Sequence, residues 1–286
     1  MIDVLPADHV HGNEELELEQ LEFELLLEGI HRRYGYDFRQ YAPASLRRRV
    51  RRRMDGEKVD TVSALQNLLL HDPAVMERLL LDLSVNVTAM FRDPTFFLSF
   101  RQNVVPILRT YPFSRLWVAG CSTGEEVYSL AILLAEEELS DRVRIYATDI
   151  NEAVIEQGRL GVFPLDKMQE YTQNYIRAGG TRSFSEYYVA RYDGARFARE
   201  LVDGVVFAQH NLVSDAGFNE FNVITCRNVM IYFAQPLQQR VHELFYDSLA
   251  MFGVLALGQK ETIRFSPHEG CFDELDAEER LFKKVR

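Results

Sequence analysis

The sequence is poor in cysteine, in tryptophan and in long apolar runs. Its three cysteines, Cys121, Cys226 and Cys271, have neither the spacing of a zinc site nor the pattern of a disulfide framework, so we expect no metal and no redox chemistry. No apolar run approaches the roughly 18 residues that cross a membrane. The N-terminus lacks a basic segment followed by an apolar core, which predicts no signal peptide and a cytoplasmic protein.

Acidic residues outnumber basic ones, 43 to 32. The net charge of −11 argues against a protein that binds nucleic acid over much of its surface. Hydrophobic residues make up 47% of the 286 positions, which is typical of a chain that folds along its whole length. That length suffices for one large domain or for two of moderate size.

A short apolar run followed by small residues stands near the middle of the chain. Residues 116–119 are expected to form a buried strand and residues 120–124 a loop that begins and ends with glycine. From Glu125 onward, apolar residues recur at the spacing of a helix packed on a sheet. Strand, glycine loop and helix together form the unit that holds nucleotide-like cofactors at the edge of an α/β sheet.

Acidic residues narrow the choice of cofactor. Glu125 and Glu126 occupy the first turn of the expected helix, where they would repel a phosphate and attract a cation such as S-adenosylmethionine (SAM). Alternatively, they merely complement the helix dipole. Asp149 ends a second expected strand, residues 143–150, where a carboxylate can accept both ribose hydroxyls. The alternative for Asp149 is an N-cap of the helix that follows.

The first 84 residues contain helical patterns and no strand pattern. Four helices are expected. They would start at Glu14, after Pro43, at Asp60 as a cap and at Pro73 with Asp72 as its cap, and they would form a small bundle. The second helix carries six arginines in seven positions, namely Arg47, Arg48, Arg49, Arg51, Arg52 and Arg53. They cannot all be buried, so we interpret them as a solvated face that either pairs with the acidic first helix or docks an acidic partner helix.

The rest of the chain alternates between strand and helix patterns, which predicts an α/β fold. Asp93 and Pro94 are expected to start a helix. Residues 187–208, with turns at Gly194 and Gly204, are expected to form a small inserted antiparallel β unit. Further strands and a terminal hairpin are expected at 205–208, 221–225, 253–257 and 271–285.

Five short motifs stand in the order seen in CheR-type methyltransferases. They are Asn86-x-Thr88-x-x-Phe91-Arg92, Ser-Thr-Gly-Glu-Glu at 122–126, Thr-Asp-Ile at 148–150, Asn211-Leu212, and Cys-Arg-Asn-Val-Met-Ile-Tyr-Phe at 226–233. The chain therefore resembles this family of SAM-dependent enzymes, which methylate glutamate carboxylates on chemoreceptors. The resemblance covers roughly residues 14 to 286.

The resemblance implies a fold, a cofactor and a partner. It implies a helical receptor-recognition domain at 1–84 and a Rossmann-like SAM methyltransferase domain at 85–286, with the small antiparallel β subdomain at about 187–208. It also implies a monomeric cytoplasmic enzyme that acts on the methylation helices of chemoreceptors, for adaptation in a chemosensory pathway, and releases S-adenosylhomocysteine. Neither a nucleic-acid partner nor direct membrane insertion is expected.

The same resemblance assigns the site. The family's cofactor contacts fall on Asn86, Thr88, Arg92, Glu125, Asp149, Asn211, Leu212, Arg227 and Asn228. Arg92 would pair with the SAM carboxylate, Glu125 with its ammonium group and Asp149 with the ribose. Asn211 and Leu212 would hold the adenine. Tyr232 would lie near the reacting methyl group and Arg227 would lean toward the acceptor, so the catalytic residues would be Arg92, Arg227 and Tyr232.

The sequence departs from the family pattern in two informative places. Residues 258–261 are Gly-Gln-Lys-Glu where many members have Gly-His-Ser-Glu, and the β unit lacks the glycine-rich extension of members that grip a receptor pentapeptide. The chain is therefore similar to the pentapeptide-independent type, and the arginine-rich helix becomes the candidate for holding the methylation helices. Competing interpretations are a non-catalytic SAM- or receptor-binding regulator, a small-molecule methyltransferase and a nucleic-acid methyltransferase.

Overall fold

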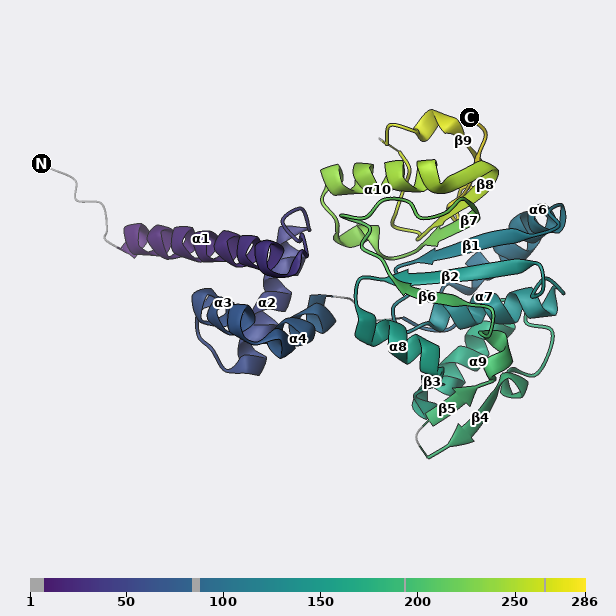
Figure 1. Ribbon diagram of the computed structural model, residues 1–286, viewed down its shortest axis with the longest axis horizontal. Helices are drawn as coiled ribbons and strands as arrows, with labels where there is room; N and C mark the ends of the chain where they lie inside the picture. The colour runs from purple at the N-terminus through teal and green to yellow at the C-terminus, as the bar shows by residue number, and fades with distance from the viewer. Residues whose placement is uncertain (1–7, 84–87, 193, 265) are drawn as a thin grey trace, which may run out of the picture. The chain divides into compact units, whose positions relative to one another are not determined.

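The structure is a computed structural model that describes residues 8–83, 88–192, 194–264 and 266–286, with side chains described from Leu16 onward (Figure 1). The chain divides into two compact units, residues 1–85 and residues 86–286. None of the described helices is both long and apolar enough to cross a lipid bilayer.

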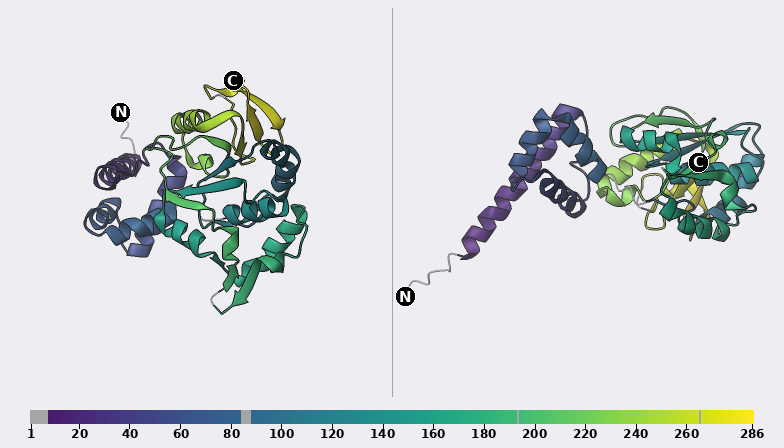
Figure 2. Two further views of the ribbon diagram at one scale, coloured as in Figure 1. Left: turned by 45° about the vertical axis from the view of Figure 1, so that its right-hand side comes forward. Right: turned by 90° about the horizontal axis from the view of Figure 1, so that it is seen from below.

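The described part of the first unit is a bundle of four helices. They are α1 (Asp8–Tyr34), α2 (Pro43–Glu57), α3 (Val62–His71) and α4 (Pro73–Leu83). Leucines at helical spacing form its core, and Leu26, Leu65 and Leu79 are fully buried. Figure 2 shows that α1 extends beyond the other three helices of this unit.

Two helix starts in the bundle show how local chemistry sets the boundaries. Asp72 caps α4 as predicted, since its Oδ1 accepts a 2.9 Å hydrogen bond from the N–H of Ala74. The cap of α3 differs from the prediction. Thr61 caps this helix, and its hydroxyl accepts from the N–H of Ala64 at 3.1 Å. Asp60 lies one residue too early to serve as the cap.

The second unit is built on a seven-stranded sheet in the order β6-β2-β1-β7-β8-β10-β9. Its strands are β1 (Ser114–Ala119), β2 (Val143–Asp149), β6 (Val206–Gln209), β7 (Phe221–Cys226), β8 (Leu249–Leu257), β9 (Phe272–Asp276) and β10 (Leu281–Lys284). The first five strands in this order are parallel, whereas β9 and β10 form the expected antiparallel hairpin at one edge. The chain order reverses between β1 and β7, which creates a switch point where the carboxyl ends of parallel strands flank a ligand site.

Helices cover both faces of this sheet, with α10 on one face and α7 on the other (Figure 1). The helices are α5 (Pro94–Ser99), α6 (Val105–Arg109), α7 (Glu125–Glu136), α8 (Glu152–Leu160), α9 (Met168–Arg177) and α10 (Gln235–Ser248). A π-helical turn, Phe100–Val104, joins α5 to α6. Short 3-10 turns lie at Leu165–Lys167, Phe184–Tyr187, Arg199–Leu201, Met230–Tyr232 and Glu269–Cys271.

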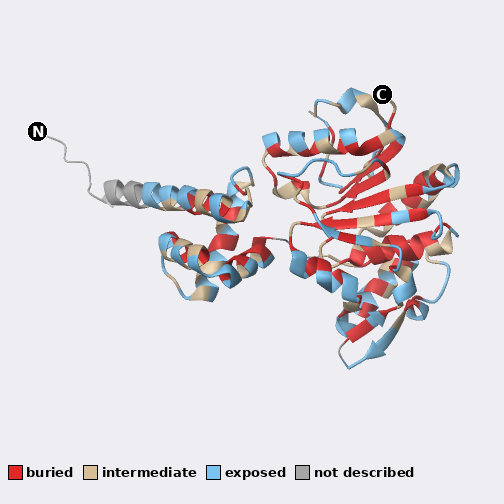
Figure 3. Ribbon diagram, viewed as in Figure 1, coloured by how far each residue is buried: buried red, intermediate tan, exposed pale blue. Residues whose placement is uncertain are grey.

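Successive side chains of β1 point to opposite faces of the sheet, and each face has its own apolar core. Leu116 and Val118 belong to the apolar cluster that includes Leu130 of α7. Trp117 points to the opposite face and packs edge-on against Phe245 of α10, with ring centroids 5.5 Å apart. Both sets of side chains are buried, and the central strands are buried along most of their length (Figure 3).

A separate three-stranded antiparallel sheet confirms the predicted β unit and corrects its boundaries. Its order is β3 (Val162–Phe163), β5 (Gly194–Phe197) and β4 (Tyr188–Arg191). The sequence did not predict β3, because two residues are too few to show a strand pattern. The segment 206–209 is strand β6 of the large sheet. The α/β fold class, with a helical first unit and a second unit that holds a large mixed sheet and a small antiparallel sheet, is confirmed.

Candidate functional site

The loop after β1 is fixed directly to the end of β2. The backbone N–H groups of Gly120 and Cys121 both donate to the carbonyl oxygen of Thr148, at 2.8 and 2.9 Å. The N–H of Ser122 donates to Oδ2 of Asp149 at 2.9 Å. The loop and Asp149 therefore lie side by side at the carboxyl edge of the sheet, where ligands bind in folds of this kind.

Gly124 ends this loop in a conformation that suits glycine. Its φ is +95°, and a Cβ atom there would lie 2.9 Å from the Cα atom of Gly158 in α8. A side chain at Gly124 would therefore be strained by its backbone and would also collide with a neighbouring helix. The two glycines allow α8 to pack tightly against the loop.

Glu125 and Asp149 place two buried carboxylates at this edge. Glu125 accepts hydrogen bonds from the hydroxyls of Thr123 at 2.6 Å and Tyr171 at 3.3 Å. Burial raises the pKa of Glu125, and it also raises the pKa of Asp149 against the opposing effect of backbone donors such as Asn151. Their ionised forms would be stabilised by a ligand that brings a positive charge and hydroxyl donors. The alternative that Asp149 is the N-cap of the following helix is excluded, because Asn151 caps α8.

The segment before α5 is tied to the first turns of α7 through Ser129. The N–H of Phe91 donates to Ser129 Oγ at 2.8 Å, and this hydroxyl donates to the carbonyl oxygen of Glu125 at 2.6 Å. The ring of Phe91 is fully buried. This anchor brings the backbone of the neighbouring Arg92 to the start of α7. Ser129 could not be recognised as an anchor from its sequence context.

Arg227 is a buried connection between three parts of the site. Its guanidinium group donates to Glu126 Oε2, to Asp93 Oδ2 and to the carbonyl oxygen of Arg92, at 3.0, 3.0 and 3.1 Å. It also lies 3.8 Å from the ring centroid of Phe96, and its side chain is 1% exposed. This geometry suits a residue that positions Arg92 rather than one that leans toward an acceptor.

The contacts of Arg227 also explain what its two acidic partners, Glu126 and Asp93, do in the structure. Glu126 accepts from Thr225 Oγ1 at 2.8 Å as well as from Arg227. Glu125 instead accepts from the hydroxyls of Thr123 and Tyr171. Asp93 precedes α5 as predicted, but its side chain makes no capping hydrogen bond to that helix. Its carboxylate pairs with Arg227 instead.

Glu261 organises the turn that follows β7. Its carboxylate accepts four backbone N–H groups, from Gly258 at 2.7 Å, Asn228 at 3.0 Å, Val229 at 2.9 Å and Met230 at 2.7 Å. Burial raises the pKa of Glu261, and the four donors act in the opposite direction. The sequence keeps the glutamate of the family pattern at position 261, but nothing in the sequence indicated a task for it.

Left-handed backbone conformations gather at this site. Phe91, Asp93, Ser122 and Asn228 have φ values of 51°, 56°, 49° and 62°. Such conformations are uncommon for residues other than glycine, and they persist where the surrounding contacts impose them, often at functional sites. Here the contacts are the hydrogen bonds to Ser129, Arg227, Asp149 and Glu261.

The remaining predicted contacts differ in how the structure places them. Asn211 and buried Leu212 follow β6 at the same edge of the sheet, and Asn211 Oδ1 accepts from the N–H of Val213 in a local turn. Tyr232 ends the 3-10 turn after β7 and is half-buried. Thr88 is half-buried in the segment before α5. Asn86 lies outside the described residues.

The arginines of α2 belong to the first unit and are less solvated than predicted. Arg49 is buried and donates to the carbonyl oxygen of Leu83, so it belongs to the core of the bundle. Arg53 is ion-paired with Asp82 and Glu57, and Arg47 is half-buried. The exposed members of the set are Arg48, Arg51 and Arg52.

Both units match family models. Residues 86–280 match the CheR methyltransferase, SAM binding domain, and residues 21–84 match the CheR methyltransferase, all-alpha domain. The chain belongs to the CheR methyltransferase family. It is accordingly a SAM-dependent methyltransferase, as the sequence motifs predicted.

Named relatives agree with this membership. A Pseudomonas putida protein with the provisional name methyltransferase Cher3 is 47% identical over 264 residues, which cover 92% of this chain and 97% of that protein. Chemotaxis protein methyltransferase 2 of Pseudomonas aeruginosa is 29% identical, over 91% of this chain and 92% of its own. The chemotaxis protein methyltransferase of Escherichia coli is 32% identical over a region that covers 63% of this chain and 62% of the Escherichia coli protein.

The site of this CheR-family chain fits SAM in its donors and acceptors. The cofactor carries an ammonium group, two ribose hydroxyls and no phosphate, and the carboxyl edge presents the buried carboxylates of Glu125 and Asp149. Burial raises the pKa of both carboxyl groups, although hydroxyl and backbone donors such as Thr123 and Ser122 act in the opposite direction. A cationic, hydroxyl-bearing ligand would stabilise their ionised forms.

Proposed function

We propose that this protein transfers the methyl group of SAM to glutamate carboxylates of chemoreceptors and releases a glutamyl methyl ester and S-adenosylhomocysteine. The names of the Pseudomonas aeruginosa and Escherichia coli relatives support a chemotaxis substrate. The cytoplasm is the compartment in which we place this reaction. The observation that carries the proposal is the pair of buried carboxylates at the carboxyl edge, with arginine as the basic side chain beside them.

The chemistry of the acceptor agrees with that arrangement. A glutamate side chain is already ionised at neutral pH, so it needs no general base to become a nucleophile. The cationic side chains among the described site residues are those of Arg92 and Arg227, whose guanidinium groups are hydrogen-bond donors. Catalysis can then rest on alignment of the reacting atoms, which contributes up to roughly 7–11 kcal/mol in well-oriented reactions.

Each site residue has a proposed task. SAM supplies an electrophilic methyl group when it is bound. Glu125 would hold its ammonium group, Asp149 its ribose and Arg92 its carboxylate, while Asn211 and Leu212 would contact the adenine. Thr88, Asn86 and Asn228 would complete the cofactor contacts, Tyr232 would border the acceptor, and Arg227 would fix Arg92 in position.

The first unit is proposed to hold the receptor. Arg48, Arg51 and Arg52 are exposed on one helix. Arg51 already pairs with Glu19 of the acidic α1 at 2.7 Å and Arg52 with Asp82 of α4 at 3.6 Å, so an acidic helical partner would compete with these two carboxylates for the guanidinium groups. Arg49 is left out of this surface because it is buried. If reversal of these three exposed arginines to glutamate left receptor methylation unchanged at physiological salt, the docking role of α2 would be excluded.

The decisive experiment has a binding arm and a catalytic arm. Calorimetric titration with S-adenosylhomocysteine should give one site per chain, and Asp149→Ala should abolish it while the protein stays folded. Incubation with radiolabelled SAM and a receptor cytoplasmic fragment should then give base-labile methyl esters. Cofactor binding without ester formation on any receptor fragment would favour a non-catalytic regulator on the same scaffold.

A further inference from the structure

Ser129 of α7 connects two segments that the proposed function assigns to the same part of SAM. Its hydroxyl donates to the carbonyl oxygen of Glu125 at 2.6 Å and accepts from the N–H of Phe91 at 2.8 Å. A helical serine often donates to the carbonyl group four residues earlier, and that bond alone leaves the acceptor side of its hydroxyl open. Here the acceptor side binds a backbone group 38 residues away along the chain, and Ser129 is fully buried.

The backbone that leads to Arg92 is held by side chains of other segments. The peptide group after Met90 is held at both ends, since its carbonyl oxygen accepts from Asn174 of α9 at 3.2 Å and its N–H donates to Ser129. The carbonyl oxygen of Arg92 accepts from Arg227 at 3.1 Å. Of these three side chains, only Ser129 belongs to α7, so it joins the backbone before Arg92 directly to the helix at the candidate site.

The carboxylate of Glu125 has hydrogen bonds of its own and does not depend on Ser129 for its position. Its two oxygens accept from hydroxyl groups in the loop before α7 and on α9. Loss of the Ser129 hydroxyl would leave these bonds in place, whereas the buried N–H of Phe91 would lose its acceptor. An unsatisfied buried N–H is costly, so this segment would shift toward another acceptor and Arg92 would move with it.

We propose that Ser129 is a positioning residue that sets where Arg92 meets the carboxylate of the cofactor, relative to the ammonium site at Glu125. This inference rests on the proposed function for the tasks of Arg92 and Glu125. The ammonium group and the carboxylate of SAM are attached to one carbon atom, so the groups that bind them must stand at a fixed separation. One hydroxyl group on α7 sets that separation, and the site thereby selects ligands that carry both charges.

Three ligands that differ in the amino-acid part of the cofactor test this role. They are S-adenosylhomocysteine, its decarboxylated analogue, and 5′-methylthioadenosine, which lacks the ammonium group as well. In calorimetric titrations of the full chain, Ser129→Ala should bind S-adenosylhomocysteine about tenfold more weakly than the wild type. It should bind the other two ligands within about twofold of the wild type, because neither reaches Arg92 with a carboxylate. Ser129→Cys, with a weaker donor and acceptor of similar shape, should show the same pattern with a loss of about threefold.

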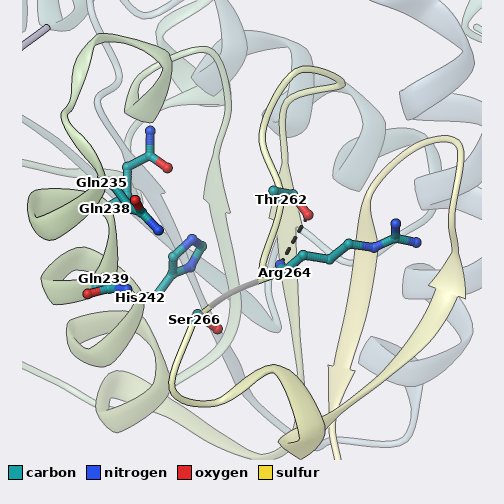
Figure 4. A pocket seen from close by; sticks show the side chains of 7 residues that line it. All are labelled: Gln235, Gln238, Gln239, His242, Thr262, Arg264 and Ser266. Carbon is teal, nitrogen blue, oxygen red and sulfur yellow. Dashed lines mark hydrogen bonds between the residues drawn. The ribbon is translucent and has the colours of Figure 1, made fainter.

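Two other serines supply matched controls, since each loses the same oxygen atom on substitution by alanine. Ser114 is buried at the start of β1, away from the glycine loop at the other end of that strand, and its hydroxyl has no hydrogen-bond partner among the described residues. Ser266 lies on the loop after β8, where it lines a polar pocket of about 170 Å³ together with Gln238 and His242 of α10 (Figure 4). Ser114→Ala and Ser266→Ala should bind all three ligands as the wild type does.

A double substitution shows whether Ser129 acts through Arg92. If it does, adding Ser129→Ala to Arg92→Ala should lower the affinity for S-adenosylhomocysteine by less than about twofold, because the contact that Ser129 positions is already lost. A further tenfold loss in the double variant would mean that Ser129 acts elsewhere. Equal losses for the three ligands in Ser129→Ala, as expected of a merely structural residue, or no loss for any of them, would also overturn the inference.

Failure of this inference can be told apart from failure of the proposed function. If Arg92→Ala weakens S-adenosylhomocysteine binding but Ser129→Ala does not, Arg92 keeps its proposed task and the role of Ser129 is wrong. If Arg92→Ala leaves the affinity unchanged, the proposed task of Arg92 is wrong and the inference falls with it. If the wild type binds S-adenosylhomocysteine but esterifies no receptor fragment, the proposed reaction is wrong, and the comparison of ligands still decides the role of Ser129.

Discussion

The backbone N–H of Asn228 donates to the carboxylate of Glu261, and Asn228 makes this contact from a left-handed conformation with φ of 62°. An unsatisfied N–H group in this buried turn would cost free energy, so the carboxylate stabilises a backbone that would otherwise be strained. The turn leads directly into Tyr232. Residues from the loop after β8 therefore control the shape of the site formed after β7.

Glu261→Gln should destabilise the protein and reduce its turnover. The new amide group would place an N–H donor against backbone donors, so the free energy of unfolding should fall by about 1–3 kcal/mol in urea titrations. Glu243→Gln, an exposed change on α10, serves as the control and should alter neither quantity. An unfolding free energy equal to that of the wild type would mean that the turn holds its shape without Glu261.

Arg227→Lys should preserve the positive charge but lose most of the hydrogen bonds that Arg227 makes. A lysine has no planar fork, so it cannot contact Glu126, Asp93 and the carbonyl oxygen of Arg92 together. Because the two carboxylates are partly exposed, we expect a loss of roughly 2 kcal/mol in unfolding free energy. We also expect weaker S-adenosylhomocysteine binding by calorimetry. If the variant bound S-adenosylhomocysteine as tightly as the wild type, Arg227 would not be needed to hold Arg92 in position.

Gly124→Ala should weaken cofactor binding. The added methyl group would meet Gly158 at 2.9 Å, and the backbone would be strained at φ of +95°. Calorimetry should show S-adenosylhomocysteine affinity reduced by about tenfold or more, with a lower unfolding midpoint. Gly204→Ala is a matched control, since a Cβ atom there meets nothing within 4 Å. Equal affinities for the two variants would show that the loop and α8 can move apart freely.

His242 should make stability depend on pH. It takes up a proton near pH 6.5 in the unfolded chain, but burial lowers the pKa to about 4 in the folded protein. Between these values the unfolded chain binds more protons, so stability falls as pH falls. From about pH 7.5 to about pH 5 this group should remove about 2 kcal/mol. His242→Gln should reduce that slope in urea titrations, and an unchanged slope would place the pH dependence elsewhere.

The order of elements could be predicted from the sequence because each is encoded locally. The glycine loop after residues 116–119, the acid at the end of β2 and the terminal hairpin follow from spacing and residue type. Asp72 was predicted as a cap because a cap needs only its own helix. The two-residue strand β3 left no such pattern, and it forms only because β5 supplies a partner.

Motif resemblance predicted which residues belong to the candidate site but not the hydrogen bonds that connect them. Motif resemblance named Arg227 but could not show that its guanidinium group is engaged by residues 134 and 101 positions away. Glu261 and Ser129 act through the backbone of other segments, and such long-range hydrogen bonds have no sequence signature. Arg49 was grouped with solvated arginines because composition alone cannot tell which member of a basic run turns inward.

The distance along the chain between Asn228 and Glu261 has a consequence for biosynthesis. During translation the turn of residues 228–230 leaves the ribosome 33 residues before its acceptor exists. Domains fold as units once their chain is available, so the site can close only when the loop after β8 has emerged. A nascent chain or a truncated product that stops short of Glu261 would thus have every named cofactor contact but would lack the carboxylate that holds the turn of residues 228–230.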